Sequence, residues 1–291
     1  MASIAVVGAT GNTGRATVKE LKGLGENPLC VVRNADKAKE VLGADANIAI
    51  ADVDDRAGME KALKGIERVF IVTGHNPKSD AQQINIIEAA KAAGAKFILK
   101  VSGGRDVVGP NAESIVGRGH HAVEQHLKNS GLQWCVLSPG LFMQNVIGQA
   151  ASIKAEGKMV LPFPKDLKIS FVDVRDTAAV AARILRDDPA RHNGKVYDFT
   201  GVQSSYEEFA KVIGEVLGKP ISYIGATLEQ AEAGMKSRGM PEWLVGHMLA
   251  IARVGAKGGF TAEKTEPIRA IVGRAPISIR QFVQDHKAAL S

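Results

Sequence analysis

The stretch VVGATGNTGR, residues 6–15, constrains the fold of this chain more than any other part of it. A short apolar run precedes it, and a helical pattern with apolar side chains on one face follows it. A strand, a glycine turn and a helix in this order form a binding loop for a pyrophosphate. The first glycine makes the tight turn, the second lets the backbone approach the anion, and the third lets the helix pack on the strand. The residues with these three roles are Gly8, Gly11 and Gly14, and the neighbours that can add contacts are Thr10, Asn12 and Thr13. The alternative is a tight turn that holds no ligand.

Short β-branched runs alternate with helical patterns through the first half of the chain. The runs are IAVVG, PLCVVR, NIAIAD, RVFIVTG, KFILKVSG and LQWCVLSPG. This alternation predicts an α/β protein with a doubly wound parallel sheet of the Rossmann type, whose ligand lies at the carboxyl ends of the strands. After about residue 150 the pattern loosens. We therefore predict a nucleotide-binding domain over residues 1–155 and a smaller, mostly helical lobe over residues 156–291, with returns to the main sheet at about 170–199.

The end of the second predicted strand indicates which dinucleotide the loop would hold. An NAD site usually has Asp or Glu there to bind the ribose hydroxyls, but this chain has CVVRNADKAK. Arg33 closes the strand and Lys37 follows one helical turn later, which places two cations where a 2′-phosphate would lie. NADP(H) is therefore the predicted cofactor, with Asp52 facing its adenine. The alternative is that both cations are solvated surface residues.

Other candidate residues close the later strands of the predicted sheet. On this ground, the residues expected to border the nicotinamide half of the cofactor are Thr73, Gly74, His75, Lys100 and Ser102. Thr73 and Ser102 are equally placed to cap the segments that follow them.

The segment SPGLFMQN supplies the residues that we expect to reach toward the substrate. They are Phe142, Met143 and Asn145. Phe142 and Met143 are equally placed to be core residues. Asn145 is the stronger candidate, because an amide beside an apolar run usually has a specific partner when it is buried.

Composition and charge exclude several classes of function. The 37 Lys and Arg are scattered among 31 acids, with a net charge of +6 and no basic block, so no nucleic-acid partner is predicted. No apolar stretch approaches the roughly 20 residues of a membrane span, and the first apolar run breaks at Gly8. We therefore expect a cytoplasmic protein with no membrane partner. The segment HHAVEQH lacks the spacing of a zinc-binding helix, so no metal site is predicted.

The catalytic pair of the common dehydrogenases with this fold is absent. Those enzymes use a Tyr, a Lys four residues later, and a Ser to move the proton that accompanies the hydride. The tyrosines of this chain are Tyr197, Tyr206 and Tyr223, and the residues four positions after them are Gly201, Ala210 and Thr227. Any proton donor must therefore be another residue, or the protein is not a reductase.

Five segments carry a family resemblance: GATGNTGR, VVRNADKAK, RVFIVTG, HHAVEQHLKNSGLQWCVLSPGLFMQN and ISIRQFVQDH. They resemble the NmrA-like family of atypical short-chain dehydrogenases, over nearly the whole chain. That family includes NADPH quinone reductases, a triphenylmethane reductase and NADP-sensing regulators, and it is related to the plant isoflavone and pinoresinol-type lignan reductases. The resemblance implies the fold and the cofactor, and it is a poor guide to the substrate.

The resemblance also implies a candidate proton donor. In the plant-type reductases a lysine opens the helix that begins this segment, and counting back from Ser130 and Gly131 places His120 at that position. The quinone reductases often have a His four residues before a Glu here, which His120 and Glu124 match. An imidazole can donate a proton near neutral pH, and Glu124 could orient it. The alternative is that His120 is a polar position on a half-exposed helix.

Together these observations predict an NADPH-dependent reductase with a small aromatic substrate. The candidate electrophiles are a quinone, an aryl carbonyl or a benzylic ether of the lignan type. A second hypothesis of a different class is a catalytically silent protein that senses NADP(H) and regulates a partner. An epimerase or dehydratase is disfavoured by the missing tyrosine, and a homodimer is left open.

Overall fold

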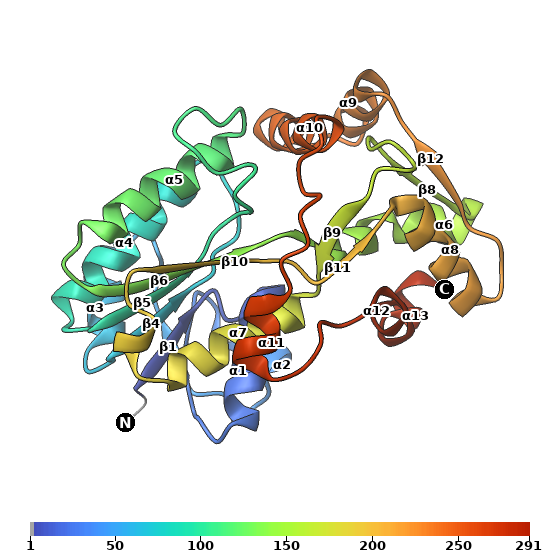
Figure 1. Cartoon of the computed structure of the whole chain (residues 1–291). Coiled ribbons are helices and arrows are strands. Elements are labelled where there is room, and N and C mark those ends of the chain that lie inside the picture. Colours follow the sequence, from blue (N-terminus) through green and yellow to red (C-terminus); the bar gives the residue numbers. More distant parts are fainter. Residues whose placement is uncertain (1–2) are drawn as a thin grey trace.

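The chain is built around one parallel sheet of seven strands, as the computed structural model, which describes residues 3–291, shows (Figure 1). The strands lie in the order β10-β6-β5-β4-β1-β2-β3. Their bounds are β1 Ile4–Val7, β2 Leu29–Val32, β3 Ile48–Ile50, β4 Arg68–Ile71, β5 Phe97–Val101, β6 Gln133–Pro139 and β10 Lys195–Phe199. The order reverses between β1 and β4, which is the point of a doubly wound sheet where ligands bind. The predicted fold class is confirmed.

Helices cover both faces of the sheet because the central strands are apolar on both sides. One face packs against α1 (Asn12–Gly23), α2 (Ala35–Leu42), α7 (Val174–Arg186) and α11 (Glu266–Val272). The other face packs against α3 (Arg56–Leu63), α4 (Ser79–Ala92) and α5 (Ile115–Lys128). Each face has its own apolar core, and the two cores hold the carboxyl ends of the strands in a fixed register.

The rest of the chain forms a lobe beside this sheet, on the right of Figure 1. A three-stranded sheet contains β7 (Leu141–Phe142), β9 (Ile169–Val172) and β11 (Val202–Ser204), and β8 (Lys158–Leu161) pairs with β12 (Ser222–Gly225). The helices of the lobe are η1 Met143–Gln149, α6 Ala150–Glu156, α8 Tyr206–Leu217, α9 Leu228–Ser237, α10 Glu242–Ala256, α12 Ile279–Asp285 and α13 Lys287–Leu290. The short helix η2, Pro189–Arg191, belongs to the main sheet, where it joins α7 to β10. Aromatic side chains fill the core of the lobe, with Phe171 against both Tyr206 and Phe209.

The predicted return to the main sheet at about 170–199 differs in part from the structure. β10 pairs in parallel with β6, and α7 packs on α1, as a return requires. β9, however, lies in the sheet of the lobe, because β7 and β11 pair with its two edges. The outer edge of β6 is taken by β10 instead.

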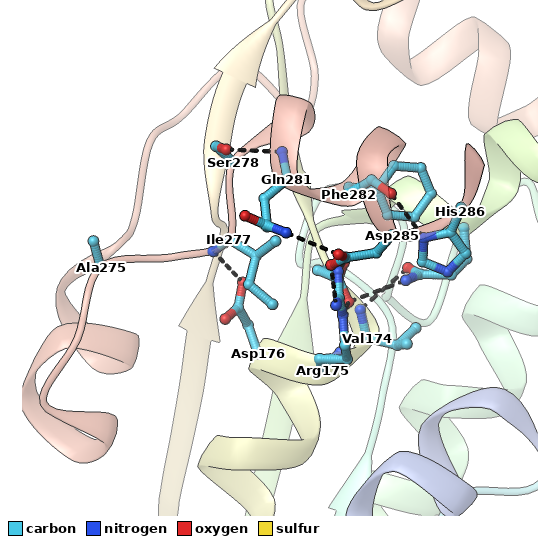
Figure 2. A network of polar contacts seen from close by, with 12 residues as sticks. Val174, Arg175, Asp176, Ala275, Ile277, Ser278, Gln281, Phe282, Asp285 and His286 are labelled. Carbon is cyan, nitrogen blue, oxygen red and sulfur yellow. Dashed lines mark hydrogen bonds and ion pairs between the residues drawn. The ribbon is translucent and has the colours of Figure 1, made fainter. Parts of the chain in front are cut away.

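A polar network ties the C-terminal helices to the start of α7 (Figure 2). The carboxylate of Asp176 is fully buried and accepts hydrogen bonds from the Ile277 amide at 2.9 Å and from Arg274 at 2.6 Å. Arg175 bridges Asp173 at 2.7 Å and Asp285 of α12 at 2.5 Å. Burial raises the pKa of Asp176, and its two hydrogen bonds limit that rise.

Asp176→Ala should lower the free energy of unfolding by about 1–3 kcal/mol, because it leaves the part-buried Ile277 amide without its acceptor and removes the buried ion pair with Arg274. Urea unfolding measures the change. The matched control is Glu232→Gln, which removes an exposed ion pair with Lys236 and should cost less than about 1 kcal/mol. Equal stability of the two variants would contradict this account of the network.

Among residues 3–291, no helix combines the length and the apolar character that crossing a membrane requires.

Candidate functional site

The glycine loop lies at the carboxyl edge of the sheet, where backbone segments meet closely. Gly8 has a φ of +92°, and a Cβ there would lie 2.1 Å from the Val72 carbonyl oxygen. A Cβ at Gly14 would lie 2.1 Å from the Gly8 carbonyl oxygen. Both positions therefore require glycine for packing alone. Gly11 differs, because a Cβ there would meet only the Gly8 oxygen, at 3.4 Å. Its open side leaves room for a ligand, as the sequence predicts.

The first turn of α1 presents free backbone donors beside this loop. Gly11 caps the helix without a side-chain hydrogen bond, and the first helical bond runs from the Arg15 amide to the Gly11 oxygen at 2.8 Å. Within the described part of the chain, the amides of Asn12, Thr13 and Gly14 have no hydrogen-bond partner. These donors and the positive end of the helix dipole form a site for an anion. The loop therefore fits the pyrophosphate of a dinucleotide.

The register of the sheet brings the predicted specificity residues to the same edge. Val7 pairs with Val31, so Arg33 follows β2 directly beside the loop. Arg33 and Lys37 are exposed, and neither forms an ion pair within residues 3–291. The side chain of Asn34 starts α2 by accepting the Lys37 amide. Asp52, also exposed, follows β3 and accepts the Asp54 amide in a tight turn.

The ends of β4 and β5 place Thr73 and Ser102 side by side, because Ile71 pairs with Lys100. Thr73 accepts a hydrogen bond from Gln83 at 3.0 Å. Gly74 has open space around it, with nothing within 4 Å of a Cβ built there. The backbone beside Thr73 is therefore accessible to a flat ligand group.

Glu124 forms a tight ion pair that the sequence did not predict. Its carboxylate accepts from Ser102 at 2.5 Å and from the two terminal nitrogens of Arg105 at 2.7 and 3.0 Å. Burial alone would raise the pKa of Glu124, but Arg105 and Ser102 lower it below the usual value. The expectation that Glu124 orients His120 is therefore wrong, because both carboxylate oxygens are committed to Arg105.

His120 instead contacts Lys100, a lysine with no exposed surface. The Lys100 Nζ atom lies 3.0 Å from His120 Nδ1 and 3.0 Å from the Val101 carbonyl oxygen. Loss of hydration lowers the pKa of Lys100 to about 7, although the charge of Glu124 partly opposes this. Burial and the charge of Lys100 hold the pKa of His120 well below its ordinary value. His120 is therefore neutral near neutral pH. It lies in the second turn of α5, which begins at Ile115, and does not open the helix.

Two further histidines continue outward from His120. The ring of His75 lies edge-on to His120 at 5.4 Å, and the ring of His247, from α10, lies 5.6 Å from that of His75. His247 contacts Ser114 at 2.7 Å. Loss of hydration and the charge of Lys100 lower the pKa of His75, although this residue keeps an exposed surface, and burial lowers the pKa of His247 to about 4. No group of three metal-ligating side chains is present among residues 3–291.

A cavity of about 80 Å³ lies between α4 and α5 beside these rings. Its lining includes His75, His120 and Gln83. The Gln83 Oε1 atom is buried and has no partner within the described residues. The cavity thus combines a neutral imidazole with a free acceptor.

The residues predicted to reach the substrate are placed differently. Met143 is fully buried in the core of the lobe, so it is a core residue and not a ligand contact. Asn145 is exposed, so the argument that a buried amide needs a specific partner does not apply to it, and its contact with the substrate stays a prediction. The amide with partners is its neighbour Gln144, which donates to Asp173 at 3.0 Å and accepts from the Val174 amide. Phe142 is half-buried against the main core and stays a prediction as a substrate contact.

Comparison with known proteins shows which family this chain belongs to. A family model described as the NmrA-like family matches residues 1–274. The chain belongs to the NmrA-like family. It is 32% identical over 288 residues to the NAD(P)H azoreductase of Xenophilus azovorans, with 98% of each chain covered.

Other known proteins match over nearly the whole chain. Quinone oxidoreductase 2 of Escherichia coli is 28% identical, over 96% of this chain and 97% of the relative. The crystal structure of the Escherichia coli NADPH-dependent quinone oxidoreductase complexed with NADPH has a TM-score of 0.85 at 26% identity, covering 97% of this chain and 99% of that one. The triphenylmethane reductase of Citrobacter sp. has a TM-score of 0.82 at 22% identity, over 97% and 99% of the two chains, which shows a shared fold alone.

Two alanine variants separate the binding and packing roles of the loop. Gly11→Ala should fold normally, because its Cβ has room, yet lose at least about tenfold in NADPH affinity, a loss of about 1.4 kcal/mol. Gly14→Ala should lower the melting temperature, because its Cβ overlaps backbone. Calorimetric titration and thermal unfolding measure the two effects. If the Gly11→Ala variant folds and binds NADPH with unchanged affinity, the glycine loop does not bind the cofactor.

A Lys100→Met variant tests whether the buried amine titrates near neutrality. Since the pKa of Lys100 is about 7 when folded and about 10.4 when unfolded, the unfolded wild type binds more protons between these values. Wild-type stability should therefore gain from this group as the pH rises through that window. The stability of the variant relative to wild type should accordingly be greatest below pH 7 and fall toward alkaline pH. A pH-independent difference in unfolding free energy would show that Lys100 does not titrate there.

Proposed function

We propose that this chain reduces small aromatic electrophiles, with quinones and azo compounds as the first candidates. The protein is an NADPH-dependent oxidoreductase. Family membership over residues 1–274 supports this, as do two full-length relatives named as an NAD(P)H azoreductase and a quinone oxidoreductase. The observation that carries the proposal is the neutral His120, which borders the cavity between α4 and α5 and contacts the buried amine of Lys100.

The residues that would hold NADPH follow from the geometry of the sheet edge. The open backbone at Gly11 and the free amides of α1 would bind the pyrophosphate. Arg33, with Lys37 close by, would bind the 2′-phosphate, since a guanidinium forms paired hydrogen bonds with such a group. Thr73, Gly74 and Ser102 would border the nicotinamide half, and the cofactor supplies a hydride when bound.

His120 would supply the proton that balances the hydride. A quinone oxygen or an azo nitrogen gains negative charge as it is reduced, and a nearby N–H donor stabilises that charge and then transfers its proton. The ring is neutral because burial depresses its pKa, and its Nδ1 accepts from Lys100, so its proton is on Nε2. Glu124 and Arg105, paired with each other, would keep the adjoining loop in place.

Arg33→Ala should weaken NADPH binding about 10- to 100-fold, the equivalent of about 1.5–3 kcal/mol for a charged hydrogen bond, and leave NADH binding nearly unchanged. Calorimetric titration with both cofactors measures the ratio. Arg191→Ala, at an exposed site in η2, is the matched control and should alter neither. Equal losses for NADPH and NADH would refute the assignment of the 2′-phosphate.

His120→Ala should lower kcat by about 10²- to 10⁴-fold, as expected for loss of a general acid, with NADPH affinity nearly unchanged. The control is His121→Ala, one residue along α5 and only half-buried. Wild-type turnover in His120→Ala would remove this residue from the mechanism. Tight NADPH binding by a wild-type protein that turns over no compound would instead favour the NADP(H)-sensing function.

A further inference from the structure

Lys100 is buried without the partner that a buried lysine usually has. No carboxylate lies within ion-pair distance of its Nζ atom among residues 3–291. Glu124, the acid whose charge raises the pKa of Lys100, is bound to Ser102 and Arg105. Burying an ammonium without a counter-ion is costly. A methionine would fill the same volume at lower cost, so packing does not explain why a lysine occupies this position.

The two neighbours of Lys100 show what the amine does. It donates to the Val101 oxygen at 3.0 Å, and its Nζ atom also lies 3.0 Å from His120 Nδ1. The ammonium form of Lys100 has only donors, so while Lys100 is protonated the Nδ1 atom of the neutral ring is the acceptor and the ring proton is on Nε2. A Cβ at Gly103 would lie 3.5 Å from His120 Cδ2, the carbon bonded to Nε2, so this side of the ring lies near the loop that follows β5. That side of the ring has no hydrogen-bond partner within the described residues.

We propose that Lys100 is the proton reservoir behind His120. The proposal rests on the reductase function above and adds the origin of the proton. As the hydride reaches the substrate, the His120 Nε2–H bond breaks and a new O–H or N–H bond forms on the substrate. At the same time one N–H bond of the Lys100 ammonium breaks, and its proton binds His120 Nδ1. The ring stays neutral with its other tautomer, and Lys100 becomes a neutral amine. After product release, Nε2 takes a proton from water and Nδ1 returns its proton to Lys100.

The charges around this pair suit such a relay. The negative charge of Glu124, on α5, stabilises the ammonium form of Lys100. The positive charge of Arg105, in the loop after β5, disfavours it. His75 and His247 are neutral near pH 7, so they add no positive charge that would block reprotonation. The pKa of Lys100, about 7, lets it give and regain a proton near neutrality. Because the ammonium is the active form, the rate of proton delivery should be full below this pKa and should fall as the pH rises through it.

The test compares three variants in steady-state turnover of a quinone or azo compound across the pH range. Lys100→Gln keeps an N–H donor to His120 Nδ1 but has no proton to release, and Lys100→Met has neither. Lys96→Met, an exposed lysine just before β5, is the matched control. If Lys100 is the reservoir, both Lys100 variants lose about 10- to 100-fold in kcat and lack the decline near pH 7, while the NADPH Kd stays at the wild-type value.

The outcomes separate this proposal from the one on which it rests. Wild-type kcat and pH profile in Lys100→Gln would overturn the reservoir and leave Lys100 only as a positioning residue. A wild-type kcat and pH profile in Lys100→Met would exclude Lys100 both as a proton reservoir and as a positioning residue, and would leave the reductase function unaffected. Absence of turnover by the wild type on every compound would overturn the reductase function and the relay with it. Nitrogen NMR of His120 checks the geometry without turnover: the Nε2–H tautomer supports it, and an Nδ1–H tautomer in the resting protein overturns it.

Discussion

The binding site depends on the close backbone contacts of Gly8 with Val72 and of Gly14 with Gly8. Gly8 and Gly14 have no side chains, and each is close enough to a carbonyl oxygen that a Cβ could not be accommodated. This contact brings the first turn of α1 against the sheet at the point where the strand order reverses. The unpaired amides of that turn are thereby presented at the edge where Arg33, Thr73 and Ser102 also end their strands.

The site divides into two polar groups with different roles. Glu124, Arg105 and Ser102 form a closed set, in which every charge has a partner and the carboxylate stays ionised. Lys100 and His120 form an open set, in which burial lowers both pKa values and, among residues 3–291, no carboxylate lies within ion-pair distance of the amine. The closed set stabilises the loop after β5, and the open set is suited to move a proton. α10 brings His247 against Ser114 at the outer side of the same region, so the lobe and the main sheet both contribute.

Features set by local sequence could be predicted, and features set by tertiary contacts could not. The glycine loop and the parallel sheet follow from spacing and alternation, which act over a few residues. The spacing of His120 and Glu124 on α5 suggested that they contact each other. Arg105 and Ser102, which come from outside α5, bind Glu124 instead.

The same limit explains the other differences. In residues 143–149 the chain forms a tight helix, which turns Gln144 toward Asp173 and leaves its neighbour Asn145 in solvent. A shift of one residue in such a helix cannot be deduced from composition. Lys100 did leave a signal, since it is a charge inside the buried run FILKV of β5. The sequence did not indicate the partner of Lys100. His120 lies 20 residues later and contacts Lys100 only because α5 packs on the sheet.

The most direct test of the central claim is the loss of NADPH absorbance with the purified wild-type protein and a panel of quinones, azo compounds, aryl ketones and benzylic ethers. We expect steady turnover with NADPH on at least one aromatic class, and slower turnover with NADH at the same concentration. NADPH that binds tightly but is consumed with no compound of the panel would contradict it.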